Sequence, residues 1–214
     1  MIRTYFSSKL QIRTMNIISN QYCASSTVDL AIKNRSKLDV TDLEGNIVFK
    51  IRSKVFPWLK AATVLRTAEG ITIATLKQKA SFFKTAWRVY RGESIEEKDI
   101  IFTAKIHSSF SGDRLDVFLA NNTSEQRDFV CKRTGTFTLY SGNAEEPNNI
   151  IAEVHKKSSF WKDSFTCKIL PNVDQTFVMA LFAISEAIVT SRSRSSMATS
   201  MATSSSIAGG FAGM

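Results

Sequence analysis

Basic and aromatic residues interleave between positions 50 and 91, and this stretch has the clearest chemical character in the chain. Ten Lys and Arg lie between Gly45 and Gly92, where Glu69 is the single acid. Cations beside a membrane attract anionic lipid by about 1 kcal/mol each. Aromatic rings anchor at a lipid interface or stack on bases. Three interpretations follow: a solvated outer face of a sheet, a surface for anionic lipid, and a surface for nucleic acid.

Four cations in this stretch are the candidate lipid-binding residues: Lys77, Lys79, Arg88 and Arg91. They come from neighbouring runs, joined by an expected hairpin through Gln78–Lys84, so we expect them to converge on one face. Alternation places several of the interleaved aromatic residues inside the fold instead; the aromatic set is Phe56, Trp58, Phe82, Phe83, Trp87 and Tyr90.

The residue types needed for catalysis or metal binding are sparse. Three cysteines are widely spaced without a C-x-x-C pair, and His107 and His155 stand far apart. A nucleophile needs a neighbouring base oriented by a third group, and structural zinc sites have closely spaced ligand pairs. No such arrangement, and no Gly-rich phosphate loop, is present. We therefore expect no catalytic, cofactor-binding or metal-binding residues, a protein that is not an enzyme, and cysteines in a reducing compartment.

The net charge is unevenly distributed along the 214 residues. The 28 Lys and Arg less the 19 Asp and Glu give +9. The first 28 residues carry +3, and the tail from Thr190 carries +2 through Arg192 and Arg194, so the middle carries only +4. A strong general affinity for nucleic acid, which the total would favour, is weakened by this distribution.

The two ends differ in composition from the middle. Residues 1–15 contain no acid, which fits an amphipathic organelle transit segment, a disordered extension, or a stretch upstream of a true start at Met15. Residues 191–214 are rich in Ser, Met and Ala and repeat a short Met-Ala-Thr-Ser motif, so we expect a disordered tail. We expect an intracellular location, in the cytoplasm, at a membrane surface or in the nucleus.

Between these ends, apolar and polar residues mostly alternate with a period of two. Turn residues recur between the alternating runs, as at Gly45, Gly70, Gly92, Gly112 and Gly142. Short strands with tight turns and no helical stretch between them predict an antiparallel sheet, either closed or sandwiched.

One segment near the C-terminus breaks this pattern. Asp174 is a plausible N-cap for a helix over 175–189, and Phe177 to Ile184 are eight consecutive apolar residues. A helix that is apolar all round is either buried or spans a bilayer. About 13 apolar residues, interrupted by Ser185 and Glu186, fall short of the roughly 20 that a span needs. We therefore expect this helix to run through the middle of a closed barrel, with Glu186 near its mouth.

Six short motifs in a fixed order resemble the plant LURP-one-related family over about residues 16–190. They are Tyr22-Cys23 followed by Val28-Asp29-Leu30, Leu43 to Phe49, Val64-Leu65-Arg66 followed by Thr75 to Lys79, Trp87 to Gly92, Ile151 to Val154 followed by Lys157, and Pro171 to Asp174 followed by Phe177 to Leu181. This resemblance implies a tubby-C-terminal-like fold, a mainly β barrel of about twelve antiparallel strands around a hydrophobic C-terminal helix.

The resemblance also implies two alternative functions. The first is a non-enzymatic barrel module that binds an anionic phospholipid, a phosphoinositide or a protein partner, in plant defence or stress signalling. The second is a scramblase-like membrane protein anchored by its C-terminal helix, because the same superfamily includes the phospholipid scramblases. The prolines that family members carry after the Tyr-Cys pair are replaced here by Ser25 and Thr27.

Overall fold

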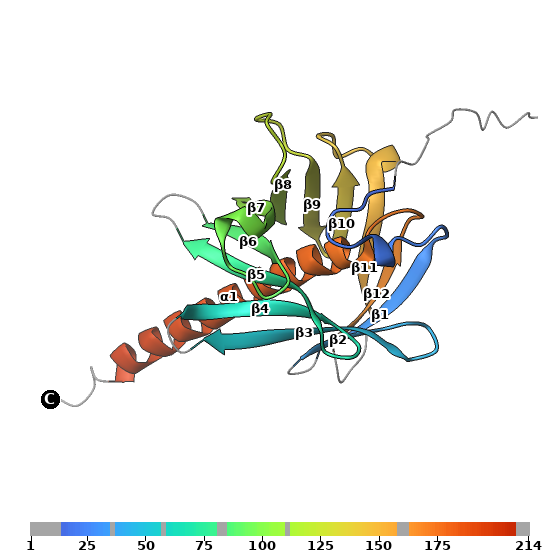
Figure 1. Ribbon diagram of the computed structural model, residues 1–214. Helices are drawn as coiled ribbons and strands as arrows, with labels where there is room; N and C mark the ends of the chain where they lie inside the picture. The colour runs from blue at the N-terminus through green and yellow to red at the C-terminus, as the bar shows by residue number, and fades with distance from the viewer. Residues whose placement is uncertain are drawn as a thin grey trace, which may run out of the picture.

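In a computed structural model of the chain, twelve antiparallel strands close into a barrel around one long helix (Figure 1). The structure describes residues 14–34, 37–56, 59–80, 85–109, 112–157 and 163–208. The strands are β1 (Val28–Asn34), β2 (Leu38–Thr41), β3 (Ile47–Phe56), β4 (Leu59–Thr67), β5 (Thr72–Ala80), β6 (Thr85–Arg91), β7 (Ile100–Ser109), β8 (Gly112–Leu119), β9 (Phe129–Thr134), β10 (Thr136–Ser141), β11 (Ile150–Lys157) and β12 (Asp163–Ile169). Short 3₁₀ helices η1 (Asn20–Tyr22), η2 (Glu97–Asp99) and η3 (Pro147–Asn149) precede β1, β7 and β11, and the helix is α1 (Gln175–Ala208).

Each strand pairs with its neighbour in sequence, and β1 closes the barrel against β12. Because every connection is a hairpin, successive turns alternate between the two ends of the barrel. We call the end where α1 begins the cap end and the opposite one, where α1 leaves, the exit end. The predicted fold class, a closed antiparallel barrel of about twelve strands enclosing a hydrophobic helix, is therefore confirmed.

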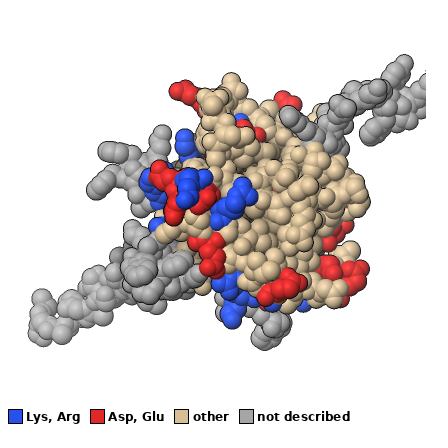
Figure 2. All heavy atoms as spheres, in the orientation of Figure 1, with Lys and Arg blue, Asp and Glu red and all other residues tan. Residues whose placement is uncertain are grey.

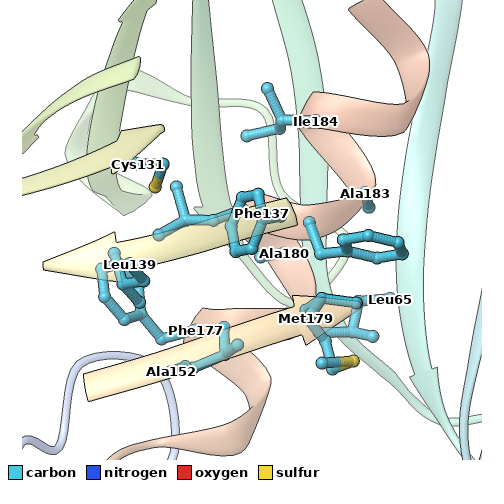
Figure 3. Close-up of a cluster of buried hydrophobic side chains, with 14 of the residues drawn as sticks. Leu65, Cys131, Phe137, Leu139, Ala152, Phe177, Met179, Ala180, Ala183 and Ile184 are labelled. Atoms are coloured by element: carbon cyan, nitrogen blue, oxygen red, sulfur yellow. The ribbon is translucent and has the colours of Figure 1, made fainter. Parts of the chain in front are cut away.

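The barrel interior is filled by the inward-facing side chains of the strands and by α1 (Figure 3). All eight residues from Phe177 to Ile184 are buried, with at most 3% of their surface exposed. Phe177 makes edge-to-face contacts with Phe102 and Phe129, and Phe182 does so with Phe137 and Phe165. Such pairs add about 0.5–1.5 kcal/mol each beyond burial, so the helix is fixed on several sides at once.

Asp174 caps α1 as the sequence predicts, and it also fixes the N-terminal segment. Its Oδ1 accepts hydrogen bonds from the backbone N–H groups of Thr176 at 2.9 Å and Phe177 at 3.3 Å, which satisfies donors of the first helical turn. Its Oδ2 accepts from the N–H groups of Ile17 at 3.2 Å and Ile18 at 2.6 Å. A single buried carboxylate thus joins two segments about 155 residues apart.

The chain joins the barrel earlier than the predicted boundary after residue 15. Met15 forms a parallel bridge with Val173, and its N–H donates to the carbonyl of Asn172 at 2.8 Å. The remainder of the predicted extension, residues 1–13, lies outside the described residues.

The predicted disorder from residue 191 differs from the structure, in which α1 continues to Ala208. The enclosed first half of α1 supplies a nucleus, and extending a formed helix costs much less than starting one. Local hydrogen bonds support the extension: Ser191 donates to the carbonyl of Ile188 at 2.8 Å and Ser193 to that of Val189 at 3.1 Å. Arg192 also forms an ion pair with Asp113 at the start of β8.

Most of the alternation in the sequence holds, with exceptions at the cap ends of β3 and β5, and at the first of these Ile47 is 41% exposed. In β12, for example, Phe165, Cys167 and Ile169 alternate with Thr166 and Lys168 in the sequence and are all buried. At β5, however, the alternation of Ile71 and Ile73 with Thr72 and Ala74 predicts buried isoleucines, whereas Ala74 is fully buried and Ile71 is 67% exposed. The reason is the register with β4, which places Ala74 opposite the buried Leu65.

A glycine is required at the start of β8. Gly112 has φ +129°, and a Cβ built there would lie 2.5 Å from the carbonyl oxygen of Arg133. Strands β8 and β9 approach each other too closely at this point for any other residue.

Candidate functional site

Strands β5 and β6 form the predicted hairpin, and their register places three of the four candidate cations on one face. Lys77 lies directly opposite Arg88, and Lys79 lies two residues further toward the exit end. Their neighbours Leu76 and Val89 are fully buried, so alternation directs the three cations outward. Like charges directly opposite each other across a strand pair destabilise a sheet unless a counter-charge is present.

Arg91 does not join the other three. It pairs with Ala74, whose side chain faces the core, and it stands at the cap end of β6. Three residues along a strand separate it from Arg88 by roughly 10 Å, and the odd spacing directs it to the opposite face. The expectation that all four cations converge is therefore wrong for Arg91. It rested on all four residues belonging to one hairpin and did not consider that alternate residues of a strand face opposite sides.

The counter-charge on this face comes from Glu97 in η2. Its Oε1 accepts a hydrogen bond from Nη1 of Arg88 at 2.6 Å, and the hydrogen bond and charge of Arg88 hold the pKa of this carboxyl below its usual value. The charge of Lys79 contributes in the same direction. In Figure 2 basic and acidic atoms lie side by side where η2 crosses the barrel wall in Figure 1. The side chain of Glu97 is 77% exposed, so it is tethered by little besides Arg88.

Sequence reasoning missed a fourth cation on this face. Lys105 of β7 lies opposite Ala86, which lies opposite Lys79, so all three positions share the outer side of the sheet. Its ammonium lies 4.1 Å from the ring centroid of Phe118, a distance suited to a cation–π contact. Alternation with the buried Ala104 was the signal that could have found it. We call Lys77, Lys79, Arg88 and Lys105 the basic face.

Of the aromatic residues of the same stretch, Tyr90 lies beside the basic face and Trp87 does not. Trp87 is buried with the inward-facing residues. Tyr90 is directed outward like Arg88, to which it is hydrogen bonded, but only 5% of its surface is exposed. Phe56, Trp58, Phe82 and Phe83 lie outside the residues whose side chains the structure describes.

Next to the basic face, a buried carboxylate organises the outer wall of β7 and β8. Asp116 is 6% exposed, and Nε2 of His107 lies 3.0 Å from its Oδ2. Arg114 and Arg127 approach its Oδ1 at 3.1 and 3.2 Å. Asp116 is thus bonded by His107, Arg114 and Arg127, although it lies directly opposite Lys105 in the register.

The cysteines and histidines occupy separate environments. Cys131 and Cys167 are buried, and burial raises the pKa of both thiols well above the usual value. His155 is exposed, and its Nε2 lies 3.8 Å from a carboxylate oxygen of Glu153. Within the described ranges, no three His, Cys, Asp or Glu side chains are grouped so that they could hold a metal ion.

One stretch of α1 in the described part of the chain, Gln175–Ser193, is long and apolar enough to cross a membrane. About 67% of that stretch is buried inside the barrel, as in the core helix of a soluble protein.

Comparison with known proteins matches residues 28–186 to the family described as LURP-one-related. The chain is 33% identical to Protein LURP-one-related 15 of Arabidopsis thaliana over 184 residues, which cover 78% of this chain and 83% of that protein. It is 31% identical to Protein LURP-one-related 1 and 30% identical to Protein LURP1 of the same plant, covering 80% and 87% of them and 78% of this chain in each case.

A solved structure extends the similarity to the fold. The X-ray structure of an Arabidopsis thaliana protein matches with a TM-score of 0.65 and 31% identity, over 80% of this chain and 97% of that one. The family match covers the barrel from the first residue of β1 to Glu186 in α1, so both strands and helix belong to the matched unit. The chain is therefore a member of the LURP-one-related family.

Proposed function

We propose that this chain is a non-enzymatic binding module whose basic face docks on anionic phospholipid at an intracellular membrane surface. The observation that carries the proposal is the arrangement of Lys77, Lys79, Arg88 and Lys105 on adjoining strands, with two of these cations directly opposite each other. A sheet surface that keeps like charges together is stabilised when an external anion binds between them.

The counter-charge of the basic face can be exchanged for a lipid phosphate. Glu97 is bonded to Arg88, and its carboxylate is largely exposed. Asp116, the other nearby acid, is already bonded by His107 and two arginines. A phosphate offers more charge and more acceptor oxygens than a carboxylate, so a phosphoinositide headgroup competes well for the same guanidinium.

Vesicle co-sedimentation tests this proposal. Binding of the full chain to vesicles of phosphatidylcholine with phosphatidylserine, with and without a phosphoinositide, is compared with binding of K77E/K79E/K105E. Arg88 is retained so that its ion pair with Glu97 stays intact. Each lost cation removes about 1 kcal/mol of attraction, so we expect affinity for anionic vesicles to fall roughly a hundredfold. Binding should also weaken as salt is added.

A matched control has the same change in net charge on the opposite wall. The variant K33E/K37E/K157E reverses three exposed lysines near β1, β2 and β11. It should bind anionic vesicles nearly as well as the unaltered chain. Equal loss in both variants would assign the effect to overall charge, and no binding by the unaltered chain would overturn the proposal in favour of a protein partner, as in defence or stress signalling.

A second candidate function rests on α1. A scramblase-like protein would use this helix as a membrane anchor, and its length and composition are sufficient. The enclosure of Phe177 to Ile184 by the barrel favours the first proposal, because a spanning helix would have to leave its aromatic partners.

A further inference from the structure

Arg91, which the fold separates from the basic face, borders a cavity at the cap end. The cavity has a volume of about 250 Å³ and lies between the N-terminal segment, the end of β6, the start of β7 and the turn after β8. Ligand pockets usually measure about 300–1,000 Å³. This one therefore suits a molecule smaller than a typical drug.

Apolar and polar residues both line the cavity, and polar atoms make up the larger part of its surface. Ile17, Ile100, Ile101 and Leu119 line it. Of these, Ile101 is buried with the core, and the others are partly exposed. The polar residues that line it are Arg91, Asn16 and Asn121. A ligand that matches this lining has an apolar body and one polar head.

The charge of Arg91 is not neutralised by the acids around it. Its backbone carbonyl accepts from the N–H of Ser94, but within the described ranges its guanidinium makes no hydrogen bond or ion pair. The acids of the adjoining loop have partners elsewhere: Glu93 accepts from Thr72, Glu97 from Arg88, and Asp99 from Ser94. A guanidinium presents two parallel N–H donors that fit a carboxylate. One guanidinium with two neutral amides matches a single negative charge better than a phosphate dianion.

The cavity is built before any ligand arrives. Its wall at Asn16 and Ile17 belongs to the segment that Asp174 holds through the N–H groups of Ile17, Ile18 and Ser19, at 2.6–3.2 Å. A preformed site avoids the free-energy cost of ordering a loop on binding. We propose that this cavity binds a small monocarboxylate with an apolar body, through an ion pair between the carboxylate and Arg91.

The test is titration of the full-length protein with 4-methylpentanoate and 3-phenylpropanoate, each beside its amide, followed by amide NMR shifts. We expect saturable shifts with dissociation constants near or below about 1 mM for the carboxylates. The amides should bind at least roughly tenfold more weakly, because they lack the charge that Arg91 recognises. The variant R91Q should lose a similar factor for the carboxylates and little for the amides.

Two further variants distinguish binding in this cavity from binding at the basic face or elsewhere on the surface. R88Q removes a guanidinium of the basic face and should leave carboxylate binding unchanged. A120L places bulk on the cavity wall and should block both carboxylates and amides. Equal binding of acid and amide, unaltered binding by R91Q, or no saturable shifts in the unaltered chain would each overturn the proposal. R91Q should bind anionic vesicles as well as the unaltered chain does, so the proposal for the cavity and the proposal for the basic face can be tested independently.

Discussion

At the scale of single residues, Asp174 is the side chain on which most local structure depends. Both carboxylate oxygens accept backbone N–H groups, Oδ1 from the first turn of α1 and Oδ2 from residues 17–19. In D174N one acceptor oxygen is replaced by an amide donor that faces N–H groups. Since hydrogen bonds to charged groups contribute about 1.5–3 kcal/mol each, we expect the free energy of unfolding to fall by about 2–4 kcal/mol, measured by urea denaturation.

Asp42 provides a control carboxylate for this substitution. It accepts from the N–H and side-chain amide of Asn46 in an exposed turn, at 2.7 and 2.9 Å. Because water can replace these bonds, D42N should change the unfolding midpoint far less than D174N. Equal effects of the two substitutions would show that the junction made by Asp174 adds nothing beyond an ordinary turn.

The three cysteines should differ in reactivity toward a thiol reagent. The thiolate is the reactive form. Burial raises the pKa of Cys131 and Cys167, and burial together with the charge of Asp174 raises that of the half-buried Cys23. A thiol whose pKa is raised by folding contributes its full stabilisation at pH values below the pKa of the unfolded state. This contribution to the free energy of unfolding is lost as the pH rises through the pKa of the folded state. At pH 8 the reagent should therefore modify Cys23 slowly, and Cys131 and Cys167 only when the protein unfolds. The number of modified thiols is counted by mass spectrometry. Fast labelling of Cys131 or Cys167 in the native protein would contradict their enclosure.

At the scale of elements, α1 has two parts with different support. Up to Ile188 its side chains are mostly buried in the barrel, and Arg133 forms an ion pair with Glu186 at 2.5 Å as the helix leaves. Beyond that point the helix depends on local bonds and the pair between Arg192 and Asp113. The outer part should thus contribute helix content and little barrel stability.

Truncation after Arg194 tests this division of α1. The truncated chain lacks the last 14 of the 34 helix residues, from 195 to 208. We expect an unchanged thermal midpoint and a lower helical signal in far-UV circular dichroism. A fall in the midpoint of several degrees would show that the outer helix packs on the barrel. An unchanged helical signal would show that residues 195–208 are not helical in solution, which is what the Ser-rich composition predicts.

At the scale of the whole molecule, enclosure of α1 predicts how the protein attaches to membranes. An alkaline carbonate wash opens membrane vesicles and disrupts electrostatic contacts. If the protein docks through the basic face alone, the wash should release all of it from the membrane fraction of cells. Retention after the wash would favour the anchored, scramblase-like alternative. The variant K77E/K79E/K105E should be found in the soluble fraction before any wash, whereas a helix-anchored protein would keep its distribution despite these substitutions.

The sequence by itself determined the alternation of the strands, the cap at Asp174 and the apolar helix, because each depends on residues close together in the chain. These features, with six short motifs, were sufficient to predict the barrel and its family. The partners of the functional groups depended on tertiary structure. Pairing β6 with β7 brought Lys105 beside Lys79, and strand parity turned Arg91 toward a cavity closed by residues about 75 positions away. A shift of one residue in register reverses the face of every side chain in a strand, so only the closed barrel decided which cations meet.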